Sequence, residues 1–519
     1  MRTRSAGLLL HPTSLPCRFG VGDLGPASET FLDWAADAGQ SLWQVLPVGP
    51  TGYGNSPYGL LSAFAGNPLL LSPERLVEDG LLSPASLEGI PSFPPDQVRF
   101  EEVAAWKKKL VRSAFDAFRR SGPSDLRSEA EAFAEAPEQA CWLADWTLFS
   151  ALKSENRWRA WTSWDEDVRD REPAALEAAR RRLADEIAYR TFVQFLFFRQ
   201  WARLRQEAHA RRIDLMGDIP IYVALDSADV WAHRRLFRLD ETGRPTAVAG
   251  VPPDYFCPDG QLWGNPLFDW DQVEEEGFAW WIERVRANQR TADLIRIDHF
   301  RGFAAYWSVP AGARTAASGA WRPGPGLPLF EAIRAALGPV AFVAEDLGDI
   351  DDSVRALLEA TGFPGMRVLQ FAFGDDDHEY QPHRFTANTV VYTGTHDNDT
   401  TTGWWRTVDE RTRTRLHEYL GSIGTDIGWE LIRTAYTSVA DRAVIPVQDV
   451  FCLGSEARMN TPGTESANWS WRALAADFTP GRAAGLRRMA ELTGRAEKRA
   501  PKDGSDAAAA AGMADLDES

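Results

Sequence analysis

The sequence predicts an α/β protein built as a (β/α)8 TIM barrel with large, mostly helical insertions between the barrel strands. Short apolar segments with the character of strands alternate with segments of helical periodicity over most of the 519 residues. This alternation is typical of βαβ units and of a parallel sheet. Three of the apolar segments also stop at or just before an acidic residue, and a closed barrel would bring the carboxyl ends of all its strands to one face.

Composition excludes several kinds of partner. The formal net charge of −18 argues against nucleic acid and against an anionic membrane surface as partners, because both are negatively charged and would repel the protein. No apolar run reaches the thickness of a bilayer, and the short apolar run at the N-terminus fails as a secretory signal. The four cysteines, Cys17, Cys141, Cys257 and Cys452, are isolated and indicate neither a disulfide framework nor a zinc site. These features predict a cytoplasmic protein.

The first predicted strand covers residues 6–10 and runs into a glycine-rich loop. Gly20, Gly22 and Gly25 fit the pattern GxGxxG, which raises the question of a dinucleotide site. The context argues against one, because the strand ends ten residues too early and no acid stands near the expected ribose position. A helix follows at residues 26–39, with proline in its first turn and glycine at its end.

The second predicted strand, residues 41–48, leads into a loop at 49–68 that is dense in glycine, proline, asparagine and tyrosine. This loop is either an ordinary surface connection or a binding loop carried by a rigid strand. Residues 72–211 then show helical periodicity, including a long amphipathic stretch at 175–212, and predict a mainly helical insertion or subdomain.

The alternation of strand and helix resumes after the insertion. The six further predicted strands cover residues 213–217, 293–297, 340–344, 366–371, 389–393 and 444–448. With the first two they make eight, which fits a closed barrel, whereas a doubly wound open sheet is the structural alternative. The catalytic barrel is expected to span residues 1–497. Residues 498–519 are acidic, of low complexity and without aromatic residues, and predict a disordered tail.

Three strand ends carry acids: Asp298 in RIDHFRGF, Glu345 in FVAEDLG and Asp397 in YTGTHDNDT. Retaining glycoside chemistry needs an ionised carboxylate and a protonated carboxylic acid about 5 to 5.5 Å apart on either side of the scissile bond. Arg296 stands two residues before Asp298, so both side chains point the same way and the cation keeps the carboxylate ionised. Taken alone, this pair fits a buried structural ion pair equally well.

The surroundings of the acids predict their roles. Asp298, beside a cation, is expected to stay ionised and attack the anomeric carbon. Glu345 has no cation so close and lies near a like charge, so its pKa should be raised and it should protonate the leaving oxygen. Asp397, with His396, would hold ring hydroxyls and favour the distorted sugar of the transition state.

A metal site is the rival interpretation of the same region. His299, His396, Asp397 and Asp399 carry suitable ligand atoms, but their spacing matches neither a helical HExxH motif nor a calcium-binding loop. We therefore expect no metal and no cofactor.

A further segment, residues 249–270, is predicted to cover the site as a lid. It reads AGVPPDYFCPDGQLWGNPLFDW and combines glycine, proline and aromatic residues without a period. A lid that excludes water would favour a sugar hydroxyl over water as acceptor. An ordinary long surface loop is the alternative, although such loops are uncommon inside compact domains.

A series of segments then resembles the motifs of one family, in that family's order. The segments are HPTSLP at 11, SLWQVLPVGPTGYGNSPY at 41, GDIPIYVALDSADVW at 217, PPDYF and GQLWGNP in the lid, RIDHFRGF, AEDLG, GTHDND, and RMNTPGT at 458. The chain is thereby identified as a member of the amylomaltases, or 4-alpha-glucanotransferases, which form glycoside hydrolase family 77 of the alpha-amylase clan. The likeness extends from residue 6 to about residue 490.

The resemblance implies a function and a set of residues. It implies Asp298 as nucleophile, Glu345 as acid/base and Asp397 as the carboxylate that stabilises the transition state. It also implies glucan contacts from a further group: Tyr58, Asp218, Trp263, Arg296, His396 and Asn460. The expected substrates are maltooligosaccharides and other alpha-1,4-glucans, with glucose as an acceptor, and the alternatives are a hydrolase with the same acids and an inactive glucan-binding protein.

Two lid positions depart from the family pattern. Cys257 stands where the resemblance implies serine, and Phe268 stands where it implies tyrosine. Each position loses a hydroxyl at similar bulk. These departures put individual lid contacts in doubt but leave the predicted reaction unchanged.

Overall fold

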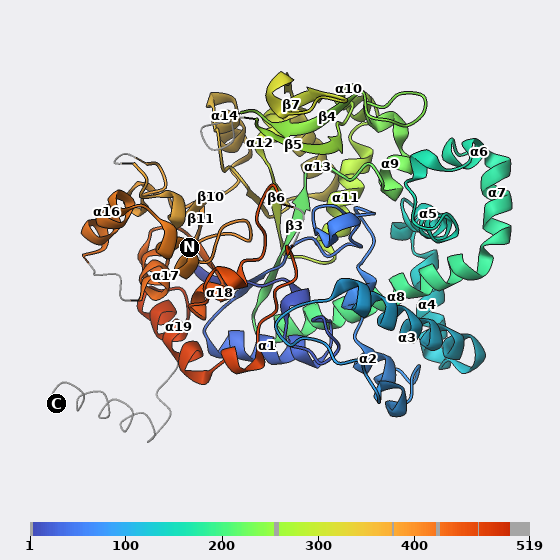
Figure 1. Ribbon diagram of the computed structural model, residues 1–519, viewed down its shortest axis with the longest axis horizontal. Coiled ribbons are helices and arrows are strands. Elements are labelled where there is room, and N and C mark those ends of the chain that lie inside the picture. The colour runs from blue at the N-terminus through green and yellow to red at the C-terminus, as the bar shows by residue number, and fades with distance from the viewer. Residues whose placement is uncertain (1–3, 254–258, 376–377, 422–425, 465–466, 499–519) are drawn as a thin grey trace.

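The computed structural model describes residues 4–253, 259–375, 378–421, 426–464 and 467–498. Its centre is a sheet of eight parallel strands (Figure 1). The strands are β1 (Ser5–Leu9), β2 (Leu42–Gln44), β3 (Asp214–Pro220), β6 (Leu294–Asp298), β9 (Phe342–Ala344), β10 (Gly365–Val368), β11 (Thr389–Tyr392) and β12 (Arg442–Pro446). Each corresponds to one of the eight predicted strands, so the prediction of these elements is confirmed.

The strand order closes the sheet almost completely on itself. The order is β10-β11-β12-β1-β2-β3-β6-β9, and all neighbouring pairs are parallel. The two outer strands also meet, because the N–H of Ala344 in β9 donates a hydrogen bond of 2.9 Å to the carbonyl of Pro364, just before β10. The predicted (β/α)8 barrel is therefore confirmed, and the doubly wound open sheet is wrong.

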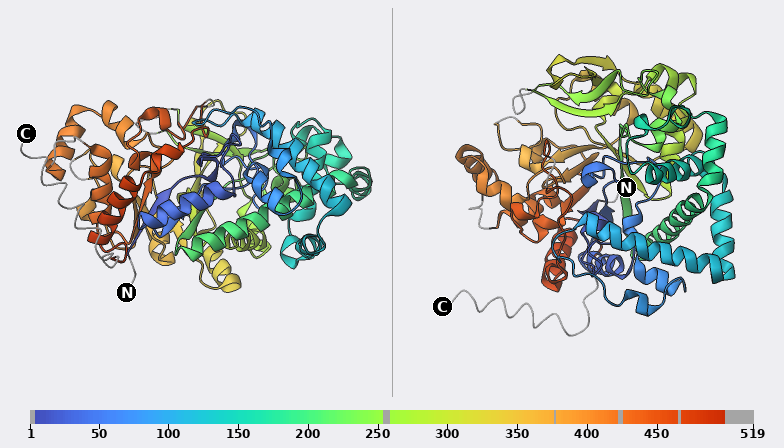
Figure 2. Two further views of the ribbon diagram at one scale, coloured as in Figure 1. Left: turned by 90° about the horizontal axis from the view of Figure 1, so that it is seen from below. Right: turned by 45° about the vertical axis from the view of Figure 1, so that its right-hand side comes forward.

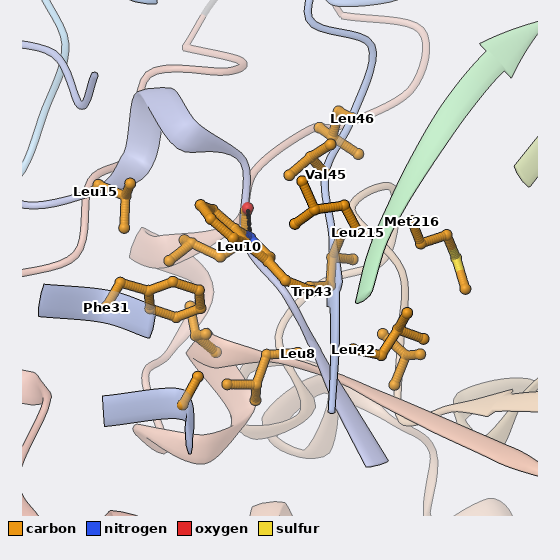
Figure 3. Close-up of a cluster of buried hydrophobic side chains, with 14 of the residues drawn as sticks. Leu8, Leu10, Leu15, Phe31, Leu42, Trp43, Val45, Leu46, Leu215 and Met216 are labelled. Carbon is orange, nitrogen blue, oxygen red and sulfur yellow. Dashed lines mark hydrogen bonds between the residues drawn. The ribbon is translucent and has the colours of Figure 1, made fainter. Parts of the chain in front are cut away.

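Apolar side chains of the strands pack against the helices around the barrel. Figure 3 shows part of this core, where Phe31 of α1 (Pro26–Asp37) lies against Trp43 of β2 with the ring centroids 4.7 Å apart. The Trp43 indole N–H donates a hydrogen bond of 2.7 Å to the carbonyl of Leu10, so its buried polar atom is paired. Dense packing of this kind gives the carboxyl ends of the strands a rigid base.

The chain between β2 and β3 forms a group of helices on one side of the barrel, at the right of Figure 1. They are α2 (Pro73–Glu78), α3 (Phe100–Ser121), α4 (Ser124–Glu135), α5 (Leu143–Glu155), α6 (Glu166–Arg169), α7 (Pro173–Arg182) and α8 (Ala184–Ala210). The amphipathic stretch at 175–212 thus contributes to two helices that part at Leu183. Trp201 of α8 anchors this group to the barrel by donating a hydrogen bond of 2.9 Å to the carbonyl of Thr291, just before β6.

The other helices connect the remaining strands, and those near the C-terminus lie on the side opposite the helical insertion (Figure 2). They are α9 (Ala228–Ala232), α10 (Trp270–Glu275), α11 (Ala279–Gln289), α12 (Arg301–Ala304), α13 (Gly326–Leu337), α14 (Asp352–Thr361), α15 (Thr401–Thr407), α16 (Glu410–Leu420), α17 (Ile427–Thr437), α18 (Val447–Val450) and α19 (Pro480–Leu492). Within the described parts of the chain, no helix has both the length and the apolar character required to cross a bilayer.

A second, antiparallel sheet lies above β3 and β6 in Figure 1. Its order is β5-β4-β7-β8, formed by β4 (Ala247–Val251), β5 (Gln261–Pro266), β7 (Ala305–Pro310) and β8 (Ala320–Pro323). The segment that the sequence presented as an unperiodic loop therefore contributes β5 and most of β4 to a sheet. Cys257 and the predicted tail beyond Lys498 lie outside the described residues.

Candidate active site

Two of the three predicted acids stand side by side at the carboxyl ends of neighbouring strands. Ile297 of β6 is paired in parallel register with Ala344 of β9, and Asp298 and Glu345 are the next residues along each strand. The N–H of Glu345 donates a hydrogen bond of 2.9 Å to the carbonyl of Ile297, which holds the two strand ends together. The barrel thus brings two acids that are distant in sequence to one place.

Arg296 holds Asp298 from below through a buried ion-pair network. Its guanidinium lies 2.9 Å from Oδ1 of Asp298 and 2.7 Å from Oδ2 of Asp218. The side chains of Arg296 and Asp218 are almost inaccessible, at 4% and 0% exposed, whereas that of Asp298 is 28% exposed. Burial lowers the pKa of Arg296, but the two carboxylates outweigh it and the net pKa is raised. A permanent cation therefore lies at the base of an accessible carboxylate.

Glu345 is held in a different environment. Its Oε2 accepts a hydrogen bond of 2.7 Å from the N–H of His299, and its Oε1 accepts one of 2.9 Å from the N–H of Leu347. Burial, and after it the nearby charge of Asp298, raise the pKa of Glu345 to about 8, although Arg296 and the two amide hydrogen bonds oppose the shift. The predicted direction is confirmed. The neighbouring charges, from which the raised pKa was predicted, contribute less to the shift than burial does.

Asp397 follows β11 and is the most exposed of the three acids, with a side chain that is 46% accessible. Its Oδ1 accepts a hydrogen bond of 2.6 Å from the Asn460 amide, and its Oδ2 lies 3.4 Å from Nε2 of His396. Arg458 fixes the backbone by donating to the carbonyls of Asp397 and Asn460, both at 2.7 Å. Side chains from the segment after β12 thus orient a carboxylate that follows β11.

Tyr58 connects the ion-pair network of Arg296 and Asp218 to the residues around Asp397. Its hydroxyl donates a hydrogen bond of 2.9 Å to Oδ2 of Asp218, and its ring stacks on that of His396 with the centroids 5.1 Å apart. Trp469 lies 5.9 Å from both rings. Burial lowers the pKa of His396, so the imidazole is neutral near pH 7. The loop after β2 therefore delivers an aromatic ring to the strand-end acids.

Trp263 places the small sheet at the site. It lies on β5, and its ring meets the His299 ring edge-on at a centroid distance of 4.8 Å. The residue is 38% exposed. Asn265 of the same strand donates a hydrogen bond of 3.0 Å to the carbonyl of Val223, after β3, and so ties β5 to the barrel. An accessible indole is thereby held against His299, the residue that follows Asp298 in the chain.

All nine predicted site residues lie in this connected arrangement. Four contributors were missed by sequence reasoning: the main-chain amides of His299 and Leu347, and the side chains of Arg458 and Trp469. The amides leave no side-chain pattern to detect. His299 has a left-handed backbone, with φ of 53°, which directs its N–H toward Glu345.

Phe268 does not belong to the site. It is completely buried and packs among the rings of Phe237, Trp270, Trp280 and Trp281, with centroids 4.7 to 5.6 Å away. The missing hydroxyl at this position therefore concerns the packing of an aromatic cluster.

The rival metal interpretation does not match the geometry. Among the described residues, the group of His, Asp and Glu side chains close enough to share an ion is His209, Asp214 and Asp293. This group lies where β3 and β6 begin, whereas the three acids lie where their strands end. Asp399 of the rival set accepts a hydrogen bond of 2.6 Å from the Ser455 hydroxyl and serves the local structure.

Comparison with known proteins identifies the family. A family model described as 4-alpha-glucanotransferase matches residues 10–476. The chain belongs to this family. A 4-alpha-glucanotransferase from Synechocystis is 49% identical over 474 residues, covering 90% of this chain and 94% of the relative. The Thermus thermophilus 4-alpha-glucanotransferase is 49% identical over 501 residues, covering 95% and 99%.

A solved structure extends this relationship to three dimensions. The Streptococcus agalactiae amylomaltase, determined in complex with acarbose, superposes with a TM-score of 0.92 at 35% sequence identity. The alignment covers 95% of this chain and all of that protein. The predicted membership in the 4-alpha-glucanotransferase family, and with it the prediction of a glucan-transferring enzyme, is confirmed.

Proposed function

We propose that the protein cleaves an alpha-1,4-glucan, retains the donor segment covalently, and passes it to the 4-hydroxyl of another glucan or of glucose. One observation carries the mechanism. An accessible carboxylate paired with a cation, Asp298, stands beside a buried carboxyl whose pKa is raised, Glu345. This pairing supplies the ionised nucleophile and the protonated acid that a retaining reaction requires.

The two steps balance with these residues alone. In the first, an oxygen of Asp298 bonds to the anomeric carbon, the glycosidic C–O bond breaks, and Glu345 gives its proton to the departing oxygen. In the second, the acceptor hydroxyl gives its proton to Glu345 and attacks the anomeric carbon, which breaks the bond to Asp298. Both substrate and product keep the alpha configuration, and neither step requires a cofactor.

The other residues would bind the sugar and its transition state. Asp397 presents an oxygen fixed by Asn460, and His396 lies beside it, an arrangement suited to ring hydroxyls whose hydrogen bonds strengthen as positive charge develops. The half-exposed ring of Trp263 would stack on the glucan near the reacting bond.

The small sheet favours transfer over hydrolysis in this proposal. The hairpin of β4 and β5 carries Trp263 against His299, next to Asp298. A substrate held under this hairpin would exclude water and leave a second sugar as the acceptor of the glycosyl group. A hydrolase with the same acids is the competing function, and the membership in a transferase family speaks against it.

Incubation with maltotriose tests the proposal. Transfer should yield glucose and a ladder of longer maltooligosaccharides, while the number of reducing ends stays constant. A hydrolase would raise the number of reducing ends, and a glucan-binding protein without activity would leave maltotriose unchanged. Chromatography of the products combined with a reducing-sugar assay distinguishes the three outcomes, and either of the last two contradicts the proposal.

The raised pKa of Glu345 predicts the alkaline limit of the reaction. Glu345 must be protonated to serve as the acid, and burial raises its pKa to about 8. The value of kcat/KM should therefore be level below this pH and fall about tenfold per pH unit above it. Initial rates on maltotriose between pH 5 and about pH 10 measure the profile, and an alkaline limb near the ordinary carboxyl pKa of about 4.3 would contradict this role.

A further inference from the structure

Two loops together hold the carboxyl of Glu345. One donating amide, that of His299, belongs to the connection between β6 and α12, and the other, that of Leu347, belongs to the connection between β9 and α14. Both connections contain left-handed backbone, with φ of 53° at His299 and 90° at Gly348. Main-chain hydrogen bonds join the two connections where they begin: the N–H of Glu345 donates to Ile297 at 2.9 Å, and the carbonyl of Glu345 accepts from Phe300 at 3.0 Å. A further contact holds the part of the second connection that follows Glu345.

Arg301 supplies that contact. It lies at the start of α12, three residues after Asp298, and its side chain is only 6% exposed. The guanidinium crosses to the other connection, where Nη1 donates to the carbonyl of Asp349 and Nη2 donates a hydrogen bond of 2.9 Å to Oδ2 of Asp351. Each nitrogen thus bonds a different residue of the loop that follows Glu345.

The receiving end of this contact is itself rigid. Asp351 is the N-cap of α14, where its Oδ1 accepts hydrogen bonds from the N–H groups of Ser353, at 2.9 Å, and Val354, at 3.2 Å. Its second oxygen is left for Arg301. The carboxylate therefore joins the first turn of a helix to a guanidinium on the neighbouring loop, a charge-assisted bond stronger than a neutral one.

Trp321 completes the arrangement from the small sheet. It lies on β8, with its ring centroid 3.8 Å from the Arg301 guanidinium carbon. A cation so close to an indole ring is attracted by the ring and is shielded from water on that face. The ring of Trp307 on β7 meets Trp321 edge-on at 5.2 Å. The guanidinium is thus fixed by three elements: α12, the start of α14, and the small sheet.

We infer that Arg301 is a positioning residue, which locks the loop after β9 to the loop after β6 and thereby holds the Glu345 carboxyl at the glycosidic oxygen. Arg301 does not touch the reacting atoms. Its effect is carried by the amides of His299 and Leu347, which set where the two carboxyl oxygens lie. The inference rests on the proposed role of Glu345 as acid and base.

This arrangement predicts a selective defect. If the lock is loosened, Glu345 is misplaced by a fraction of an ångström, while Asp298 keeps its own contact with Arg296. Proton transfer should then fail and nucleophilic attack should not. Displacements of this size can cost about 100-fold in rate, because the reacting atoms leave their productive geometry.

A donor that needs no proton reveals such a defect. With α-maltosyl fluoride, the oxygen of Asp298 bonds to the anomeric carbon and fluoride departs as an anion, so Glu345 is not required as acid. With azide as acceptor, the anion attacks the anomeric carbon and breaks the bond to Asp298, so Glu345 is not required as base. Together the two reagents bypass both of its roles.

The variant Arg301→Lys keeps the charge but cannot form both bonds from a planar group. On maltotriose, kcat should fall about 10- to 100-fold, with KM changed less than about threefold. With the fluoride and azide, turnover should stay within about threefold of the parent protein. Asp351→Asn and Trp321→Leu should also lose kcat on maltotriose but not with the fluoride and azide, and the loss should be smaller. The test therefore does not depend on a single substitution.

The control variant is Arg355→Lys, an exposed arginine of α14 whose side chain forms an ion pair with Glu379, and it should behave as the parent. An equal loss with both donors in Arg301→Lys, a rise in KM alone, or unchanged activity on maltotriose would each overturn the inference. Glu345→Gln serves as the reference for a pure acid/base defect. If α-maltosyl fluoride and azide do not restore turnover in Glu345→Gln, the proposed role of Glu345 fails and the inference falls with it. If it is rescued and Arg301→Lys is not, only the inference is wrong.

Discussion

Replacing Asp298 with asparagine should lower glucan transfer by at least about 10⁴-fold, since it removes the nucleophile and leaves the shape of the site intact. The amide has no negative charge to stabilise the developing cation and does not form the covalent intermediate. The loss should appear in kcat on maltotriose. Because the Arg296 guanidinium remains paired with Asp218, the variant should stay folded.

Two further measurements tie this loss to chemistry. Asp271→Asn removes the same charge from an exposed residue of α10 and should leave the rate unchanged. In Glu345→Gln, reaction with α-maltosyl fluoride without azide should accumulate a protein heavier by one maltosyl group, and digestion should place that group on the peptide containing Asp298. A label on another peptide, or transfer that survives in Asp298→Asn, would refute the assignment.

The sequence contained enough information for the barrel and for the three acids. Barrel strands are buried on both faces and appear as short apolar runs, and the functional side chains follow directly after them. Asp298 and Glu345 were identified for this reason. Their adjacency follows from strand order, which the alternation of strands and helices determines once the barrel is assumed.

The small sheet was missed for an identifiable physical reason. Its strands pair across long separations, as in Gly250 with Trp307, and Gly250 weakens the strand signal. A Cβ at this glycine would lie 2.5 Å from the carbonyl oxygen of Gln261, so only glycine allows β4 and β5 to approach so closely. The feature that makes the hairpin possible is therefore the one that made it look like a loop.

The electrostatics of the site were predictable only in part. The charge of Arg296 beside Asp298 could be read from a spacing of two residues on a strand. The burial of Glu345, which is the main cause of its raised pKa, depends on the packing of several elements and has no local signature. The pairing of Asp218 with Arg296 was also not predictable from local sequence, because it joins two strands, β3 and β6, that are far apart in the chain.

The buried pair of Arg296 and Asp218 should dominate the stability of the site. Replacing Arg296 with methionine leaves the fully buried carboxyl of Asp218 without its cation. Breaking a buried ion pair in this way costs about 3 to 5 kcal/mol of unfolding free energy. Activity should be lost as well, because Asp298 loses the same cation. Urea unfolding at several pH values measures the cost, and Arg355→Met, an exposed arginine, is the matched control.

The cost should depend on pH in a definite direction. Burial already raises the pKa of Asp218 to about 7, although Arg296 opposes it, and removing the cation raises this pKa further. A folded state that binds a proton more tightly than the unfolded chain loses stability as pH rises between the two pKa values. The difference in unfolding free energy between Arg296→Met and the parent should therefore be small at pH 5 and widen above pH 7.

Adding Asp218→Asn to the variant should remove this pH dependence and recover part of the stability, because no carboxylate is then left to ionise in the core. A gap independent of pH, or a double variant no more stable than Arg296→Met at pH 9, would show that the pair does not act through the charge of Asp218.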